Sequence, residues 1–231
     1  MVGLSAKELL SLMERGQGQE PVTRGLLMLE YAWPGHEMQA RDDLPLGDRD
    51  RLLTSLRVAT FGGSAPLVAA CPHCEAEVET VLDLRCLPPE SPSGTPSSAT
   101  FEHQGRQLRY RRPSSSDLRV ALTAGGDAAT VVAERCLETI PDDDLVAAFG
   151  AILDANDPWA EVNLELNCPD CAGTWMVVFD IVDYFWREIE SRGRRLLREV
   201  HTLARCYGWS EGEILSLSPM RRQLYLGMVN P

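Results

Sequence analysis

The sequence predicts an α+β protein in which two β-hairpins form a split, four-cysteine ribbon, with a helical insertion between the hairpins and a long helix after them. Three observations support this prediction. A Cys-x-x-Cys pair occurs twice, each time between segments that alternate apolar and polar residues. Amphipathic, helix-like segments occupy the block between the two pairs. Residues 180–207 then keep the apolar period of a long helix.

The N-terminal segment, residues 1–43, is expected to be helical. Its Ser5-Ala6-Lys7-Glu8 stretch has the form of a capping box, and leucines at helical spacing follow it. Residues 22–31 are apolar, but their pattern does not decide between helix and strand. A further helix is predicted from Leu44-Pro45-Leu46-Gly47-Asp48 to Phe61, where two glycines end it.

The two cysteine pairs are predicted to lie in the turns of β-hairpins. Strands are expected over 66–70 and 75–84 around the first pair, and over 159–167 and 174–179 around the second. Such hairpins are typical of a zinc ribbon, in which each Cys-x-x-Cys turn supplies two metal ligands. Residues 44–179 would therefore form one ribbon core that is split by the insertion.

The insertion is expected at about residues 87–158. Its first part, residues 88–100, is rich in Pro, Ser and Gly and is predicted to be a flexible loop. A hairpin over 101–112 follows. Amphipathic helices are then predicted over 116–123, 127–137 and 142–156.

Residues 180–231 are predicted to be a helical segment. The long helix over 180–207 should end at Gly208, because glycine adopts the left-handed conformation of a helix C-terminus without strain. Ser210-Glu211-Gly212-Glu213 is a second capping box, and Ser218-Pro219 places a cap residue before proline at the first helical position. We therefore expect short helices after the long one.

Four cysteines, Cys71, Cys74, Cys168 and Cys171, are the candidate ligands of a structural Zn²⁺ ion. Four thiolates fill a tetrahedral site and leave no position for a reacting water, so we expect no enzymatic activity. A redox dithiol and a pair of disulfides are the alternatives. A redox dithiol normally accompanies a βαβ pattern, which this sequence lacks. Disulfides are rare in the cytosol.

The chain contains seven cysteines, an odd number that argues against complete disulfide pairing. Those outside the two pairs lie in apolar patterns and are expected to be small buried side chains; they are Cys86, Cys136 and Cys206. The N-terminus has no signal-peptide pattern, which predicts a cytoplasmic location.

The composition makes nucleic acid an unlikely partner. The 231 residues carry a formal net charge of −12, whereas binding to phosphates requires a basic face. No apolar run reaches the roughly 18 residues of a membrane span. No phosphate-binding loop, nucleophile elbow or metalloprotease helix is present, so we expect no small-molecule substrate.

A local basic and aromatic surface interrupts this acidity near the C-terminus. We predict that it contacts a partner protein through Arg194, Arg195, Arg198, Trp209, Arg221, Arg222 and Tyr225. The alternative is that the arginines form a solvated face and pair with carboxylates of the same chain.

Several C-terminal stretches resemble a known family. These are Asp180–Glu190, Arg195–Ala204, Tyr207–Pro219 and Arg221–Leu226. Two further features, Leu44–Asp50 and the Cys-Pro-x-Cys pairs, fit the zinc-containing members of this family. The sequence is similar to baseplate proteins of contractile phage tails and phage-tail-like injection systems, related to T-even phage baseplate hub and wedge assembly proteins. The resemblance spans roughly residues 44–228.

This resemblance implies a non-enzymatic component that binds other baseplate, tube or hub subunits and is assembled into a particle, or an assembly chaperone for that particle. The alternative function is an acidic zinc-ribbon regulator that binds nucleic acid or a transcription partner. A metalloenzyme is a third class. The acidic charge opposes the regulator, and a metal site closed by four thiolates opposes the enzyme.

Overall fold

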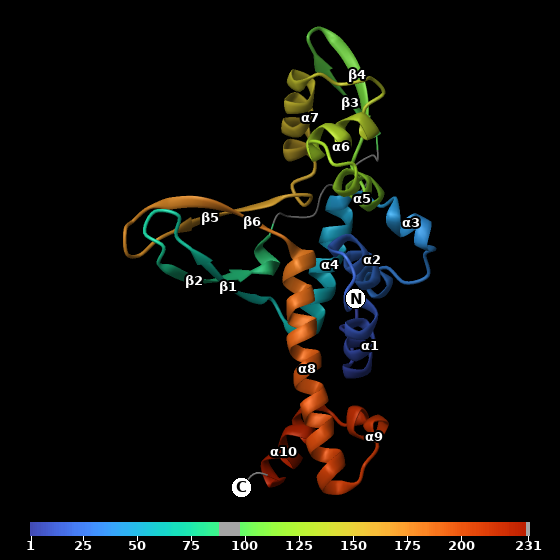
Figure 1. Ribbon diagram of the computed structural model, residues 1–231, viewed down its shortest axis with the longest axis vertical. Helices are drawn as coiled ribbons and strands as arrows, with labels where there is room; N and C mark the ends of the chain where they lie inside the picture. The colour runs from blue at the N-terminus through green and yellow to red at the C-terminus, as the bar shows by residue number, and fades with distance from the viewer. Residues whose placement is uncertain (88–97, 230–231) are drawn as a thin grey trace.

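A long helix, α8 (Ile181–Tyr207), forms the axis of the molecule (Figure 1). The structure is a computed structural model, and it describes residues 1–87 and 98–229. A β arm leaves one side of α8, the helical insertion lies at one end, and two short helices lie at the other. Most of the loop predicted over 88–100 lies outside the described residues.

Three helices pack along α8 and build the main hydrophobic core. They are α1 (Ala6–Gly16), α2 (Pro21–Ala32) and α4 (Leu46–Phe61). The capping box at Ser5 is confirmed. The undecided segment 22–31 is helical, and its apolar side chains fill the space between α4 and α8. The fully buried members of this core include Leu12, Met28, Leu29, Leu53, Leu56, Phe185 and Ile189.

Two short helical elements were not predicted. They are α3 (Met38–Asp42) and the 3₁₀ turn η1 (Leu84–Cys86). Each is too short to show an apolar period, which explains why the sequence pattern does not reveal it.

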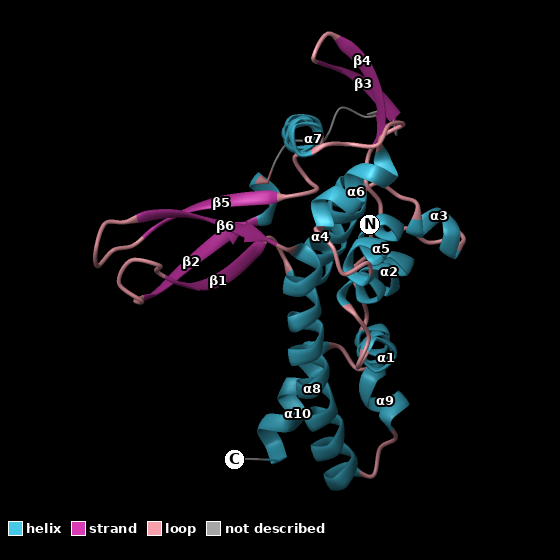
Figure 2. Cartoon of the chain, turned by 45° about the horizontal axis from the view of Figure 1, so that its top comes forward, coloured by secondary structure: helices cyan, strands magenta, loops and turns pink. Residues whose placement is uncertain are grey.

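The β arm consists of two antiparallel hairpins that form separate two-stranded sheets. In one, β1 (Ser64–Ala70) pairs with β2 (Glu77–Asp83). In the other, β5 (Val162–Asn167) pairs with β6 (Thr174–Phe179). The hairpins run side by side away from α8 (Figure 2). The four predicted strands are confirmed with small shifts of their ends.

The two hairpins are joined at both ends of the arm. At the base, Leu67, Leu82 and Leu164 pack on the main core. At the tip, Val78 and Trp175 pack beside the buried cysteines Cys71 and Cys168. A pocket of about 170 Å³ lies between the hairpins along part of their length.

The insertion builds a second, smaller core. Its elements are β3 (Ser98–His103), β4 (Arg106–Arg111), α5 (Ser115–Thr123), α6 (Ala128–Cys136) and α7 (Asp143–Asn156). Tyr110 lies at the centre of this core and makes edge-to-face contacts with Phe101 and Phe149, with ring centroids 5.7 Å apart in each pair. The hairpin turns at Gln104-Gly105, where both residues have positive φ, as a tight hairpin turn of this kind requires.

Three predicted helices begin one residue later than expected. The residue predicted to be first is in each case the N-cap, whose carboxylate accepts a backbone N–H of the first turn: Asp127 for α6, Asp142 for α7 and Asp180 for α8. At the other end of α8, Gly208 has φ of 70° and ends the helix as predicted.

The chain ends with α9 (Glu211–Ser216), opened by the predicted capping box at Ser210, and α10 (Pro219–Val229). Both helices pack back on the last turns of α8. Within the described part of the chain, no helix is both long enough and apolar enough to span a bilayer. The three-segment division at residues 43 and 179 stays a prediction, and the main core contains side chains from all three segments.

A buried carboxylate joins the insertion to the main core. Helix α4 has no side-chain cap of its own, and Asp157, directly after α7, lies against its first turn. Burial raises the pKa of Asp157 above its usual value, and the neighbouring Arg112 guanidinium, 3.4 Å away, offsets only part of this increase. A negative charge at a helix N-terminus is favourable. A side chain at Gly47 would collide with this carboxylate, so the first turn of α4 requires glycine.

We therefore expect Gly47→Ala to lower the free energy of unfolding by about 1–3 kcal/mol, the usual cost of overpacking. The matched control is Gly150→Ala in α7, where an added methyl group meets no atom within 4 Å. This control should be neutral or stabilising by up to about 1 kcal/mol, because alanine favours a helix interior. Urea denaturation measures both, and equal stabilities would contradict the role given to Asp157.

Candidate metal centre

The two Cys-x-x-Cys turns have the same backbone conformation. In the first, the N–H of Cys71 donates to the carbonyl of Ala76 and the N–H of Glu75 donates to the carbonyl of Cys71. The second repeats both bonds with Cys168, Ala172 and Gly173. The residue after each pair is left-handed, with φ of 61° at Glu75 and 57° at Ala172. Such conformations are unfavourable for residues other than glycine, so both turns keep a strained geometry that directs two sulfurs to one side.

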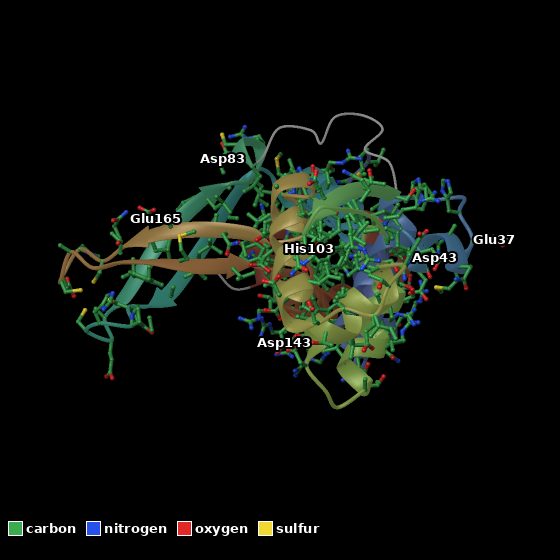
Figure 3. All side chains as sticks on the ribbon, turned by 90° about the horizontal axis from the view of Figure 1, so that it is seen from above. Glu37, Asp43, Asp83, His103, Asp143 and Glu165 are labelled. Carbon is green, nitrogen blue, oxygen red and sulfur yellow. The ribbon has the colours of Figure 1, made fainter. Side chains whose placement is uncertain are left out.

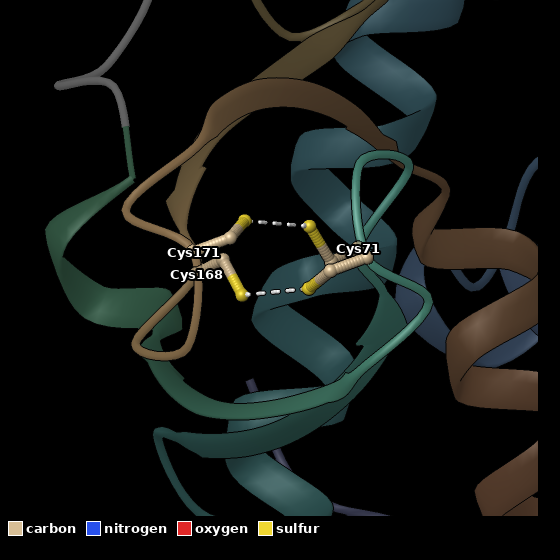
Figure 4. Close-up of side chains that lie close together, drawn as sticks. Cys71, Cys168 and Cys171 are labelled. Atoms are coloured by element: carbon tan, nitrogen blue, oxygen red, sulfur yellow. Dashed lines mark hydrogen bonds between the residues drawn. The ribbon is translucent and has the colours of Figure 1, made fainter.

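The turns bring all four predicted cysteines together at the tip of the β arm (Figure 4). The Sγ atoms of Cys71 and Cys171 are 3.7 Å apart, and those of Cys74 and Cys168 are 3.6 Å apart. All four sulfurs lie within 4.8 Å of one another. A tetrahedron with metal–sulfur bonds of about 2.3 Å has edges of about 3.8 Å, so the cluster has the size of a four-thiolate metal site. None of the four forms a disulfide.

The charges of the sulfurs depend on one another. Burial raises the pKa of Cys71, but backbone N–H groups of His73 and Cys74 and the adjacent thiols outweigh it and lower the value to about 6. For Cys74, the backbone N–H of Ala76 lowers the pKa, whereas neighbouring sulfurs and burial raise it to about 12. Four thiolates so close repel one another, and only a bound cation would allow all four to ionise together.

His73 and Gly173 enclose the cluster. The backbone N–H of His73 points at the Cys71 sulfur, 3.4 Å away. A Cβ at Gly173 would lie 2.5 Å from Cδ2 of His73 and 3.3 Å from the Cys171 sulfur. Gly173 is thus a residue of the site that the sequence analysis missed. The only signal was a glycine directly after the second turn, a position that also suits an ordinary hairpin.

The expectation of burial for the other three cysteines is correct for one of them. Cys136 is buried in the insertion core. The prediction is wrong for Cys86 and Cys206, which are exposed. Cys86 ends the η1 turn, and Cys206 lies on the outer side of the last turn of α8, so neither apolar pattern faces a core.

One residue of the predicted partner surface belongs to the interior. The assignment of Arg222 to an exposed surface is wrong, because its side chain is 2% exposed. Its guanidinium donates to the buried carboxylate of Glu199 at 3.1 Å and to the carbonyl of Leu217 at 2.7 Å. Gln223 and Arg195 also bond to Glu199. Arg222 therefore holds α10 against α8.

The other members of this predicted surface lie on α8 and beyond its end. Arg194, Arg198 and Arg221 are exposed. Trp209 and Tyr225 are half-buried in an aromatic cluster with Tyr207, with ring centroids 4.7–5.6 Å apart. Trp209 stacks on Tyr207, and Tyr225 meets both rings edge-on. Their role in binding a partner stays a prediction.

Comparison with known proteins identifies the family. A family model described as T4 bacteriophage base plate protein matches residues 36–155. The match contains α4, the first cysteine pair and nearly all of the insertion, and it ends before the second pair and α8. The stretches after Asp180 that carried most of the sequence resemblance lie outside it. A search of curated proteins and a search of solved structures gave no match. Because the family model covers more than half of the chain, the protein belongs to the family of T4 bacteriophage base plate proteins.

Proposed function

We propose that the protein is a structural or assembly component of the baseplate of a contractile phage tail or phage-tail-like injection particle, and that it acts by binding hub, tube or other baseplate subunits rather than as an enzyme. The family match over residues 36–155 is the observation that carries this proposal. The shape supports it, because the β arm, the insertion and the terminal helices present separate surfaces around one long helix (Figure 1).

We further propose that Cys71, Cys74, Cys168 and Cys171 hold one structural Zn²⁺ ion, as in a split zinc ribbon. The sulfur–sulfur distances of 3.6 and 3.7 Å support this proposal, and so does the equal conformation of the two turns. Four thiolates would complete the coordination of the ion. The metal would then join two hairpins that are far apart in the sequence, and its contribution would be to the stability of the arm.

Replacing one ligand tests the metal site. Purified, reduced wild-type protein is expected to contain about one zinc ion per chain, and Cys171→Ser should lose most of it, because three thiolates bind zinc more weakly than four. Cys206→Ser is the matched control, since Cys206 is exposed and lies outside the cluster. Elemental analysis measures the zinc. Zinc-free wild-type protein, or a Cys171→Ser protein with its full zinc content, would contradict the proposal.

Co-purification tests the role in the particle. Tagged full-length protein, expressed in cells that produce the particles, is expected to purify with baseplate, tube or hub subunits. Mass spectrometry of finished particles would then separate a mature component, present in them, from an assembly factor, which is absent from them but bound to intermediates. If the protein binds none of these subunits, and its deletion leaves the number of intact particles unchanged, the proposed function is wrong.

A further inference from the structure

A groove of about 710 Å³ separates strand β1 from helix α8. One wall is the α8 face that contains Arg187, Arg192, Arg195 and Arg198. The other wall is formed by β1 and the end of α4, with apolar surface from Phe61, Leu67 and Val68. One wall of the groove is therefore a row of cations, and the opposite wall is partly apolar.

Two of these arginines have no ion-pair partner in the described part of the chain. Arg187 pairs with Asp183 at 2.9 Å, and Arg195 pairs with Glu199 at 3.2 Å. No carboxylate of the described residues lies within ion-pair distance of Arg192 or Arg198. The solvated-face interpretation, in which the chain's own carboxylates neutralise the arginines, thus accounts for only part of the row.

The one carboxylate that lines the groove is already occupied. Glu188 accepts two bonds, of 2.8 and 2.7 Å, from the buried guanidinium of Arg57. Arg57 also donates to the carbonyls of Gly62 and Ser64. Elsewhere, acidic side chains such as Glu37, Asp83, Asp143 and Glu165 lie around the outside of the molecule (Figure 3). The chain as a whole has a net charge of −12, but this groove is positive. It is therefore complementary to a negatively charged partner.

The free edge of β1 is poorly suited to adding another strand. Its outward carbonyls at Ser64 and Pro66 already accept bonds from Arg57 and from the Tyr184 hydroxyl, the latter at 3.1 Å. Pro66 has no N–H to donate. Recognition in the groove must then depend on side chains, chiefly on the arginines of α8 and the exposed Val68.

We propose that this groove binds an acidic segment of a neighbouring baseplate subunit, an inference that rests on the proposed function. Arg192 and Arg198 are six residues apart, or about 9 Å along the helix. The segment would place carboxylates at that separation and an apolar side chain against Val68, which also lines the groove. A protein segment is favoured over nucleic acid because the net charge of −12 of the chain repels a long polyanion more than a short acidic stretch.

Charge reversal in the full-length protein tests this inference. Arg192→Glu with Arg198→Glu should lower the amount of protein recovered with baseplate subunits by about tenfold, because attraction becomes repulsion. The matched control is Lys7→Glu with Arg106→Glu, which changes the net charge equally at exposed positions outside both the groove and the predicted partner surface. This control should retain most of the binding. Circular dichroism should show equal helix content in both variants, and Arg192→Lys with Arg198→Lys should recover much of the binding.

Two outcomes would overturn the groove assignment without touching the proposed function. In the first, wild-type protein and the charge-reversal variant purify equally well with baseplate subunits. In the second, a 20-nucleotide DNA probe binds wild-type protein and not the variant, while subunit binding is unchanged. If wild-type protein itself binds no baseplate subunit, the proposed function fails and the groove assignment fails with it.

A photo-crosslinking amino acid in place of Ser191, which is exposed in the groove, identifies the occupant directly. We expect a crosslinked peptide from another subunit that carries at least two Asp or Glu residues. Crosslinks confined to this chain, or to a peptide without acidic residues, would contradict the inference.

Discussion

The arrangement of the β arm depends on one constraint, the convergence of four sulfurs from two turns that are far apart in the sequence. Each hairpin alone is a two-stranded sheet, which is marginally stable in water. The base of the arm joins the main core, whereas the cluster at the tip is small, with Ala76, Val78 and Trp175 packed around the cysteines. The relative position of the two hairpins therefore depends on the sulfur cluster, and a bound metal would fix it far more firmly than these apolar contacts.

The remaining architecture is organised by α8. Its apolar face packs against the N-terminal helices and α4. Its C-terminal part contacts α9 and holds α10 through the buried Arg222–Glu199 pair. A buried ion pair of this kind is sensitive to the loss of either partner, because a single charge left in the interior is costly. The same helix supplies the arginines of the groove. One long helix thus sets the spacing between the arm, the groove and the terminal aromatic cluster.

The features that sequence could predict are those encoded by neighbouring residues. The cysteine turns, the capping boxes at Ser5 and Ser210 and the alternation of the strands are local patterns, and the structure confirms them. The features that it could not predict depend on partners distant in the chain. Asp157 against the start of α4 and the burial of Arg222 are of this kind, because nothing in their local sequence distinguishes them from surface residues. The resemblance identified the correct family, although the family model matches a region N-terminal to its most specific stretches.

The way the arm is attached has a mechanical consequence. Strand β1 follows the end of α4 after two glycines, and β6 is separated from α8 by a single residue, Asp180. Arg57 of α4 and Glu188 of α8 cross-link these two helices close to the points of attachment. A pulling force on the tip would be divided between the hairpins and would pass directly into two helices that are already braced against each other. A displacement of the tip would therefore reach the long axis of the molecule through α4 and α8, which the Arg57–Glu188 pair joins.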